Sequence, residues 1–122
     1  MDQFEVTNEI PKALDESDAK AVAEAIAEVL DSKKGNDIKV LYVEDKTVIA
    51  EYFVLCTGNS NTQIKALAGE VEYKLGLRGV SPYGVEGRDN NNWLILDYSN
   101  VIVHIFSRES REFYNLDKLY AD

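Results

Sequence analysis

The feature that most constrains the fold is an uninterrupted apolar run, Tyr52 to Cys56, followed at once by the turn Thr57-Gly58-Asn59. A run without polar alternation predicts a strand that is buried on both faces. Ser60 and Gln63 then have the spacing of a capping box, which predicts that a helix begins there. Together with the apolar segment that follows from Val80, this pattern favours a strand–helix–strand unit.

Hydrophobic periodicity adds further elements on both sides of this unit. Ser17 is the expected N-cap of a helix that stops at Lys33-Lys34-Gly35. The chain ends in a helical tail from residue 107, whose last apolar side chains are expected to pack on the core: Leu116, Leu119 and Tyr120. The predicted strands cover residues 38–43, 48–57, 80–85, 93–98 and 101–106.

The last two strands are separated only by Ser99-Asn100, which predicts a hairpin with a two-residue turn. Such a turn requires positive φ, which Asn100 tolerates well. Pro82 places the 80–85 strand at an edge or bulge. The sequence thus predicts an α/β (α+β) domain over residues 17–122, preceded by an acidic leader over 1–16. Its expected form is a mixed five-stranded sheet with flanking helices, in the order αββαβββα.

The charge of the chain limits its partners. Among its 122 residues, 13 Lys and Arg stand against 22 Asp and Glu, which gives a net charge of −9. Binding to nucleic acid depends on cationic surface, so a sequence-specific nucleic-acid partner is not expected. A basic partner fits this charge, and so does mere solubility. No apolar run approaches the roughly 20 residues of a membrane-spanning helix, and the single Cys56 fits a reducing cytoplasm.

Several catalytic arrangements are incomplete in this sequence. The turn at Gly58 lacks the further glycines or lysine of nucleotide-binding loops, so a helix cap is its simpler interpretation. Asp97 shares its strand face with Ile95 and Ser99 and has no second carboxylate for two-metal chemistry. His104 is the only histidine, which excludes a histidine-based metal cluster and favours a partly buried, hydrogen-bonded ring. No metal, cofactor or enzymatic activity is therefore expected.

The hairpin carries the residues most typical of a protein interface. Trp93, Asp97 and Tyr98 combine aromatic area with a carboxylate that can meet a lysine or arginine. Trp93 and Asp97 are four residues apart on one strand, so they point to the same face, and Tyr98 points to the other. From the residues alone, a contact surface and a tryptophan that simply covers the edge of the core are equally good interpretations.

Several segments together resemble the Iojap family, the ribosomal silencing factors. These segments follow the family's order and spacing over about residues 17–122: Glu51-Tyr52-Phe53-Val54, Thr57-Gly58-Asn59-Ser60, Gln63-Ile64-Lys65-Ala66, Glu86-Gly87, Trp93-Leu94-Ile95-Leu96-Asp97-Tyr98, His104-Ile105-Phe106 and Arg111-Glu112-Phe113-Tyr114-Asn115-Leu116. The family's hairpin corner Asp-Tyr-Gly-Asp reads Asp97-Tyr98-Ser99-Asn100 here.

The resemblance implies a fold related to nucleotidyltransferases without their catalytic acids. It also implies a factor that binds the fourteenth protein of the large ribosomal subunit, blocks joining of the small subunit and represses translation when nutrients are short. The family's contact surface falls on Trp93, Asp97 and Tyr98, with His104 as a secondary candidate, and the free protein is expected to be a homodimer. Two alternatives are a nucleotidyltransferase-type enzyme with an unusual metal site and a plain dimerisation module.

Overall fold

The computed structural model describes residues 11–88 and 92–121. Its five strands form one sheet in the order β1-β2-β5-β4-β3. The strands are β1 (Asn36–Tyr42), β2 (Tyr52–Gly58), β3 (Gly84–Glu86), β4 (Trp93–Asp97) and β5 (Val101–Ser107). The central pair β2 and β5 is parallel, and the other pairs are antiparallel, so the predicted mixed five-stranded sheet is confirmed.

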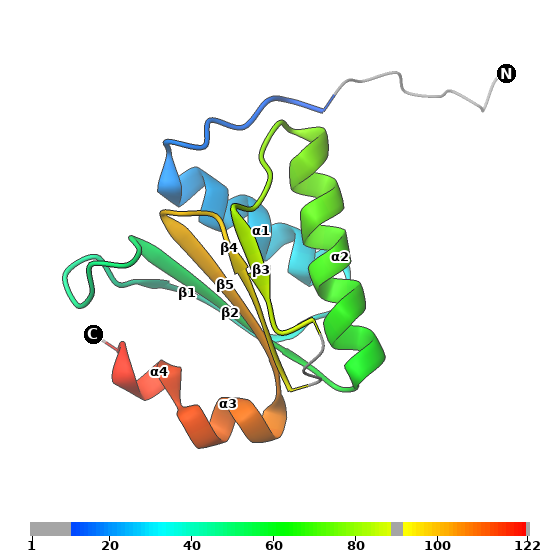
Figure 1. Ribbon diagram of the computed structural model, residues 1–122, viewed down its shortest axis with the longest axis vertical. Helices are drawn as coiled ribbons and strands as arrows, with labels where there is room; N and C mark the ends of the chain where they lie inside the picture. Colours follow the sequence, from blue (N-terminus) through cyan, green and yellow to red (C-terminus); the bar gives the residue numbers. More distant parts are fainter. Residues whose placement is uncertain (1–10, 89–91, 122) are drawn as a thin grey trace, which may run out of the picture.

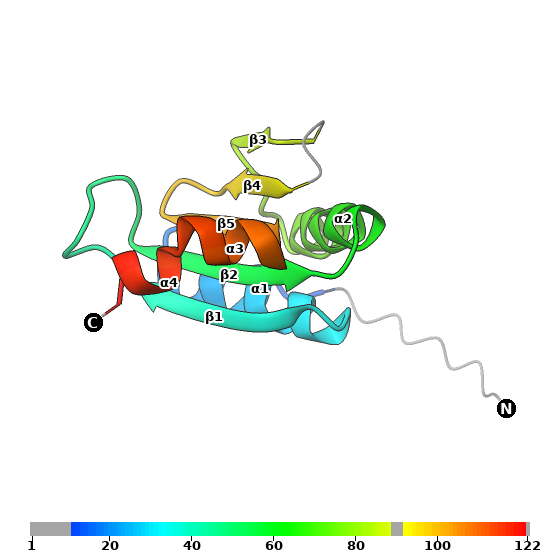
Figure 2. The same ribbon diagram turned by 90° about the horizontal axis from the view of Figure 1, so that it is seen from below.

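Two pairs of helices lie on opposite faces of the sheet, as Figures 1 and 2 show. The long helices α1 (Ala19–Ser32) and α2 (Asn61–Leu77) enclose the larger core with one face. The short helices α3 (Arg108–Tyr114) and α4 (Leu116–Leu119) lie on the other face, where Leu116 joins a smaller core around Phe53 and Phe106. The order αββαβββα is therefore confirmed, with the last helical segment divided at Asn115, which has a φ of 50°.

The two long helices begin with side-chain caps. Asp18, and not the predicted Ser17, caps α1 by accepting a hydrogen bond from the amide of Ala21 at 3.1 Å. Ser17 instead donates hydrogen bonds from its amide and its hydroxyl to the carboxylate of Asp15. Ser60 caps α2 as predicted and accepts from the amide of Gln63 at 3.1 Å. In a capping box the side chain of Gln63 would accept a hydrogen bond from the amide of Ser60. Here its Oε1 accepts from the amide of Asn59, one residue earlier.

Helix α2 ends in a left-handed glycine turn. The amide of Gly79 donates to the carbonyl of Gly76 at 3.0 Å, and that of Val80 donates to Leu75 at 2.9 Å. These two bonds form a Schellman motif, which needs the positive φ of 87° that Gly79 supplies. Val80 and Leu75 are both buried, so the hydrophobic contact that accompanies the motif directs the chain back to the core.

The burial of the central strand agrees with the prediction, but the bounds of β2 and β3 differ from the predicted ones. Residues 53–58 are buried, so the prediction of a strand covered on both faces is confirmed. β2 starts at Tyr52, and Val48 and Ile49 lie in an exposed loop before it. β3 is parallel to β2 but is separated from it by two strands and lies at the edge farthest from β1, so the connection through α2 crosses over β5 and β4. The predicted edge strand is thus confirmed in position, but it is shorter than the predicted 80–85 and shifted to 84–86.

The predicted hairpin pairs β4 with β5 and turns at Ser99-Asn100. The positive φ falls on Ser99, at 74°, and not on Asn100, where it was expected. The side chain of Asp97 explains the difference, because its Oδ1 accepts a hydrogen bond from the amide of Ser99 at 2.7 Å and holds that residue in place. In the tail, Leu116 is buried and the ring of Tyr120 makes an edge-to-face contact with that of Phe53, so their predicted packing on the core is confirmed. Leu119 is 66% exposed, so the predicted packing of Leu119 is wrong.

Within the described ranges, no helix is both long and apolar enough to cross a membrane.

Candidate protein-binding site on the open sheet face

β4 and β3 lie beside the helices α3 and α4 and not beneath them (Figure 2). Along β4, alternate residues point toward α1 and α2 and are buried, whereas Trp93, Ile95 and Asp97 point to the other face and are half-buried. The predicted shared face of Trp93 and Asp97 is therefore confirmed. Glu86 on β3 stands opposite Ile95, and Ile102 on β5 stands opposite Asp97. We call these five residues (Glu86, Trp93, Ile95, Asp97 and Ile102) the open sheet face.

Trp93 lies at the end of this face nearest to α3. Its ring centroid is 4.5 Å from that of Tyr114, 5.4 Å from that of Phe106 and 5.8 Å from that of His104. The other side of the indole lines a shallow pocket of about 240 Å³ together with Glu86, Gly87 and Ile95. Trp93 thus joins the smaller core on one side and remains available to a partner on the other.

Gly87 allows β3 to approach Trp93 this closely. Its φ is 88°, and a Cβ atom at this position would lie 2.2 Å from the carbonyl oxygen of Trp93. Real Cβ atoms never come so close to an oxygen, so any other residue here would push β3 away from the open sheet face. The Glu86-Gly87 pair therefore has a direct role in shaping this surface.

His104 lies beneath Trp93 and does not reach the surface. It is 7% exposed, and its Nδ1 accepts a hydrogen bond from the indole Nε1 at 3.1 Å. Burial lowers the pKa of the imidazole to about 4, so the ring is neutral near pH 7. Because Nδ1 is an acceptor, the hydrogen is on Nε2, and Nε2 has no hydrogen-bond partner among the described residues.

Tyr98 is on the opposite side of the sheet from the other predicted contact residues. It is 5% exposed and packs in the larger core beneath the long helices. Within residues 11–88 and 92–121 its hydroxyl has no hydrogen-bond partner, and burial raises its pKa. Of the four residues selected from the sequence, the structure therefore places Trp93 and Asp97 on the open sheet face, with His104 under it and Tyr98 behind it.

Sequence reasoning missed the contribution of α3. Tyr114 stacks beside Trp93 and is 50% exposed, and Phe113 contacts Tyr114 with a centroid distance of 5.0 Å. The two rings extend the apolar surface from β4 onto the helix. Only the tertiary fold brings them to Trp93, although the alternation along β4 would have been enough to add Ile95.

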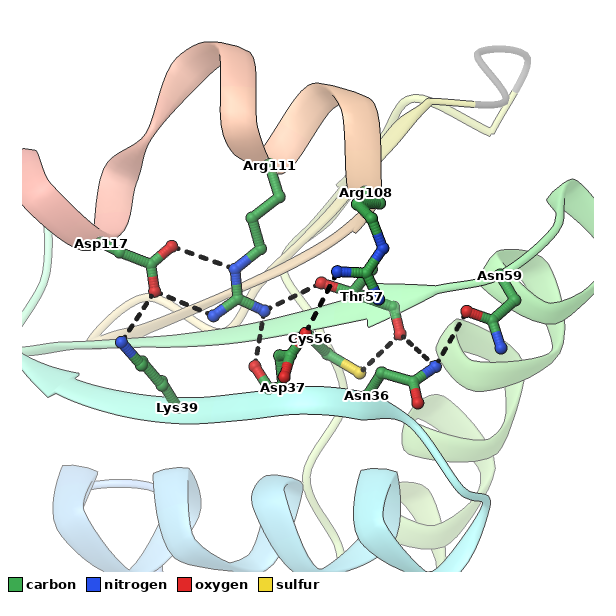
Figure 3. Close-up of polar contacts among 9 residues, drawn as sticks. All are labelled: Asn36, Asp37, Lys39, Cys56, Thr57, Asn59, Arg108, Arg111 and Asp117. Atoms are coloured by element: carbon green, nitrogen blue, oxygen red, sulfur yellow. Dashed lines mark hydrogen bonds and ion pairs between the residues drawn. The ribbon is translucent and has the colours of Figure 1, made fainter.

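Apart from the open sheet face, a polar cluster joins the C-terminal helices α3 and α4 to the sheet (Figure 3). The buried guanidinium of Arg111 donates to both oxygens of Asp117, at 3.0 and 2.9 Å, and to the hydroxyl of Thr57 at 2.9 Å. It also donates to the backbone carbonyl of Asp37. Hydrogen bonding from Arg111, with Lys39 at 3.3 Å, lowers the pKa of Asp117 to about 2. We call this arrangement the Arg111 clasp.

The clasp borders a polar pocket of about 320 Å³. Arg108 lies 3.8 Å from Asp37 at its rim, so ion pairs join the cations of the pocket to Asp37 and Asp117. Across the described ranges, no three His, Cys, Asp or Glu side chains are grouped so that they could hold a metal ion. The arrangement serves to attach α3 and α4 to β1 and β2.

Cys56 is fully buried in the larger core, as its neighbours in the sequence indicate. Burial raises the pKa of the thiol to about 11. A cysteine that remains protonated and inaccessible is not a nucleophile.

Comparison with known proteins assigns the family. The model of the RsfS family, described as "Ribosomal silencing factor during starvation", matches residues 16–122. Ribosomal silencing factor RsfS of Bacillus subtilis is 35% identical over 103 residues, which cover 84% of this chain and 87% of that protein. A mouse protein named "Mitochondrial assembly of ribosomal large subunit protein 1" is 29% identical over 91% of this chain and 50% of its own length.

A solved structure agrees with these matches. A crystal structure of a protein from Chromobacterium violaceum superposes with a TM-score of 0.80 at 32% identity, covering 84% of this chain and 85% of that one. The names of the relatives describe ribosome-associated regulatory factors and not enzymes. The chain belongs to the RsfS family of ribosomal silencing factors.

Proposed function

We propose that this protein binds the large ribosomal subunit through its fourteenth protein, sterically blocks joining of the small subunit and so represses translation when nutrients are limiting. Family membership supports the general role, and the name of the mouse relative refers to the large subunit. The observation that carries the proposal is the open sheet face, on which the apolar side chains of Trp93 and Ile95 follow each other along β4, with the carboxylate of Asp97 at the far end of the strand and that of Glu86 beside Ile95 on β3. An apolar strip with carboxylates along its edge fits a basic protein surface.

The net charge of −9 supports a protein as the point of contact. Ribosomal RNA is a dense array of phosphates and repels an acidic chain, whereas a basic ribosomal protein attracts it. Translation in bacteria takes place in the cytoplasm, and the cytoplasm is therefore the location that this proposal requires.

We assign different roles to the four residues selected from the sequence. In this proposal Trp93 and Asp97, which lie on the open sheet face, contact the partner directly, and Tyr114 beside Trp93 extends this contact onto α3. Tyr98 and His104 are buried and act by supporting the surface from within. Asp97 has a second task, because one of its oxygens holds the hairpin turn.

Trp93→Ala is expected to lose the ability to keep ribosomal subunits apart while keeping its fold. Truncating a buried aromatic anchor costs about 2 kcal/mol of binding free energy, which is about thirtyfold in affinity. The measurement is a light-scattering assay of the joining of purified large and small bacterial subunits, with circular dichroism as the folding test. Tyr73→Ala is the matched control, because Tyr73 is an exposed aromatic residue on α2. If folded Trp93→Ala blocks joining as well as the parent does, the open sheet face is not the contact surface.

Association with the large subunit is expected to slow as ionic strength rises. Charge steering accelerates the encounter of an acidic protein with a basic surface, and salt screens it. The apolar strip of the contact should leave the dissociation rate nearly unchanged. Surface plasmon resonance with immobilised large subunits measures both rates, and an association rate that is indifferent to salt would show that the net charge serves solubility only.

We also propose that the free protein is a homodimer, as the family resemblance implies. Sedimentation equilibrium of the purified chain measures this directly. A homodimer that does not migrate with large subunits in a sucrose gradient would favour a plain dimerisation module over a silencing factor. Transfer of labelled nucleotide that disappears in Asp97→Asn would favour a nucleotidyltransferase-type enzyme.

A further inference from the structure

The only tryptophan of the chain is tied by a directional bond to the only histidine. The indole Nε1 of Trp93 donates to Nδ1 of His104 at 3.1 Å, between two adjacent strands of the sheet. Ring contacts with Phe106 and Tyr114 also hold the indole, but they do not engage its N–H group. The hydrogen bond is the contact that fixes which edge of the indole turns inward.

His104 is an unfavourable residue for this position by the criterion of packing alone. The ring is in edge contact with Phe53 at 4.8 Å and lies near Phe106 at 6.1 Å, in an aromatic environment. Its Nε2–H is buried and has no acceptor among the described residues. A buried donor without an acceptor destabilises a fold, and a phenylalanine of similar shape would avoid this loss.

The histidine therefore provides something that an apolar ring cannot. A phenylalanine at 104 would fill the space but would leave the indole N–H of Trp93 without its acceptor. The β4–β5 register places residue 104 diagonally across from Trp93, within reach of the indole and away from the surface. Residue 104 is thus suited to act on Trp93 and not on a partner.

We infer that His104 is a positioning residue, which holds the indole of Trp93 in the orientation that presents its outer edge on the open sheet face. It acts through Trp93 and does not touch the partner. This inference rests on the proposed function in one respect, namely that Trp93 is an anchor for the large subunit. The orientation itself can be measured in the free protein.

Two substitutions separate positioning from packing. His104→Phe keeps the ring and removes the acceptor, whereas His104→Asn places an oxygen two bonds from Cβ, where Nδ1 stands in histidine. Because Trp93 is the only tryptophan, intrinsic fluorescence reports on this residue alone. We expect His104→Phe to be at least as resistant to urea as the parent, with Trp93 about twofold more accessible to acrylamide quenching. Its affinity for purified large subunits should fall about tenfold, the size of effect that the loss of one oriented hydrogen bond produces.

His104→Asn is expected to restore both the quenching and the affinity of the parent to within about twofold. Unchanged quenching in folded His104→Phe would overturn the inference, and so would an Asn variant that stays as accessible and as weak as the Phe variant. If His104→Phe does not fold, His104→Asn still tests the inference. A folded Asn variant in which Trp93 is more accessible to acrylamide than in the parent would show that an acceptor at residue 104 does not orient the indole. The proposed function fails separately, if Trp93→Ala binds large subunits like the parent while the quenching results hold.

Discussion

Arg111→Met is expected to lower the free energy of unfolding by about 3 kcal/mol or more. Removing one partner of a buried ion pair leaves the other charge uncompensated, and losses of about 3–5 kcal/mol are typical. Here Asp117, the hydroxyl of Thr57 and the carbonyl of Asp37 would all lose a donor at once. Urea unfolding followed by circular dichroism measures the change. Since the clasp attaches α3 and α4, the variant should also lose affinity for the large subunit.

Arg108→Met is the matched control for this experiment. Arg108 is on the same helix, but its side chain is 63% exposed and its distance to Asp37 is 3.8 Å. An exposed pair of this kind contributes about 0–1 kcal/mol, so the control should stay close to the parent. If Arg111→Met and Arg108→Met unfold at the same urea concentration, the clasp does not hold the C-terminal helices.

Acidification from about pH 6.5 to pH 4 is expected to lower the free energy of unfolding by up to about 3 kcal/mol. The pKa of His104 is about 4 in the fold, against an ordinary value of 6.5. Between these two values His104 is protonated in the unfolded chain but remains neutral in the folded one. The free energy of unfolding therefore falls as the pH is lowered. Below about pH 4 both states are protonated at this residue, and its effect levels off.

His104→Phe should remove this dependence, because the chain has no other histidine. Urea titrations of parent and variant at several values between pH 4 and pH 7 provide the comparison. The carboxylate of Asp117 titrates lower, since its pKa is about 2 in the fold, and its stabilising effect is lost only below about pH 3.8. An equally steep fall in the variant would assign the acid sensitivity to other groups.

The elements that could be predicted from the sequence are those fixed by near neighbours. The hairpin of β4 and β5, the buried β2 and the cap at Ser60 all depend on residues a few positions apart, and the structure confirms them. The shift of the first cap from Ser17 to Asp18 shows the limit of this reasoning. Both side chains can cap a helix, and the choice depends on the hydrogen bonds that Ser17 makes to Asp15 instead.

Features that depend on distant contacts could not be read from the pattern. The alternation along β4 correctly separated Trp93 from Tyr98, but it could not show that Tyr98 is enclosed by helices. Arg111 has the appearance of an ordinary charge on an exposed helix, and only the approach of Thr57 and Asp117 reveals why it is buried. Tyr114 joins the candidate site for the same kind of reason, because α3 folds back across the sheet.

The parallel pairing at the centre of the sheet has a consequence for how the chain folds. Tyr52 pairs with Val101, about fifty residues away, so β2 finds its second neighbour only after most of the chain has been made. The β1–β2 and β4–β5 pairs can form locally, but joining them requires closure of a large loop that contains α2. During synthesis, β2 therefore keeps an apolar, unpaired edge until residue 107 has emerged, and this edge is the segment most exposed to wrong pairing. Docking of β5 against β2 is the step expected to set the folding rate.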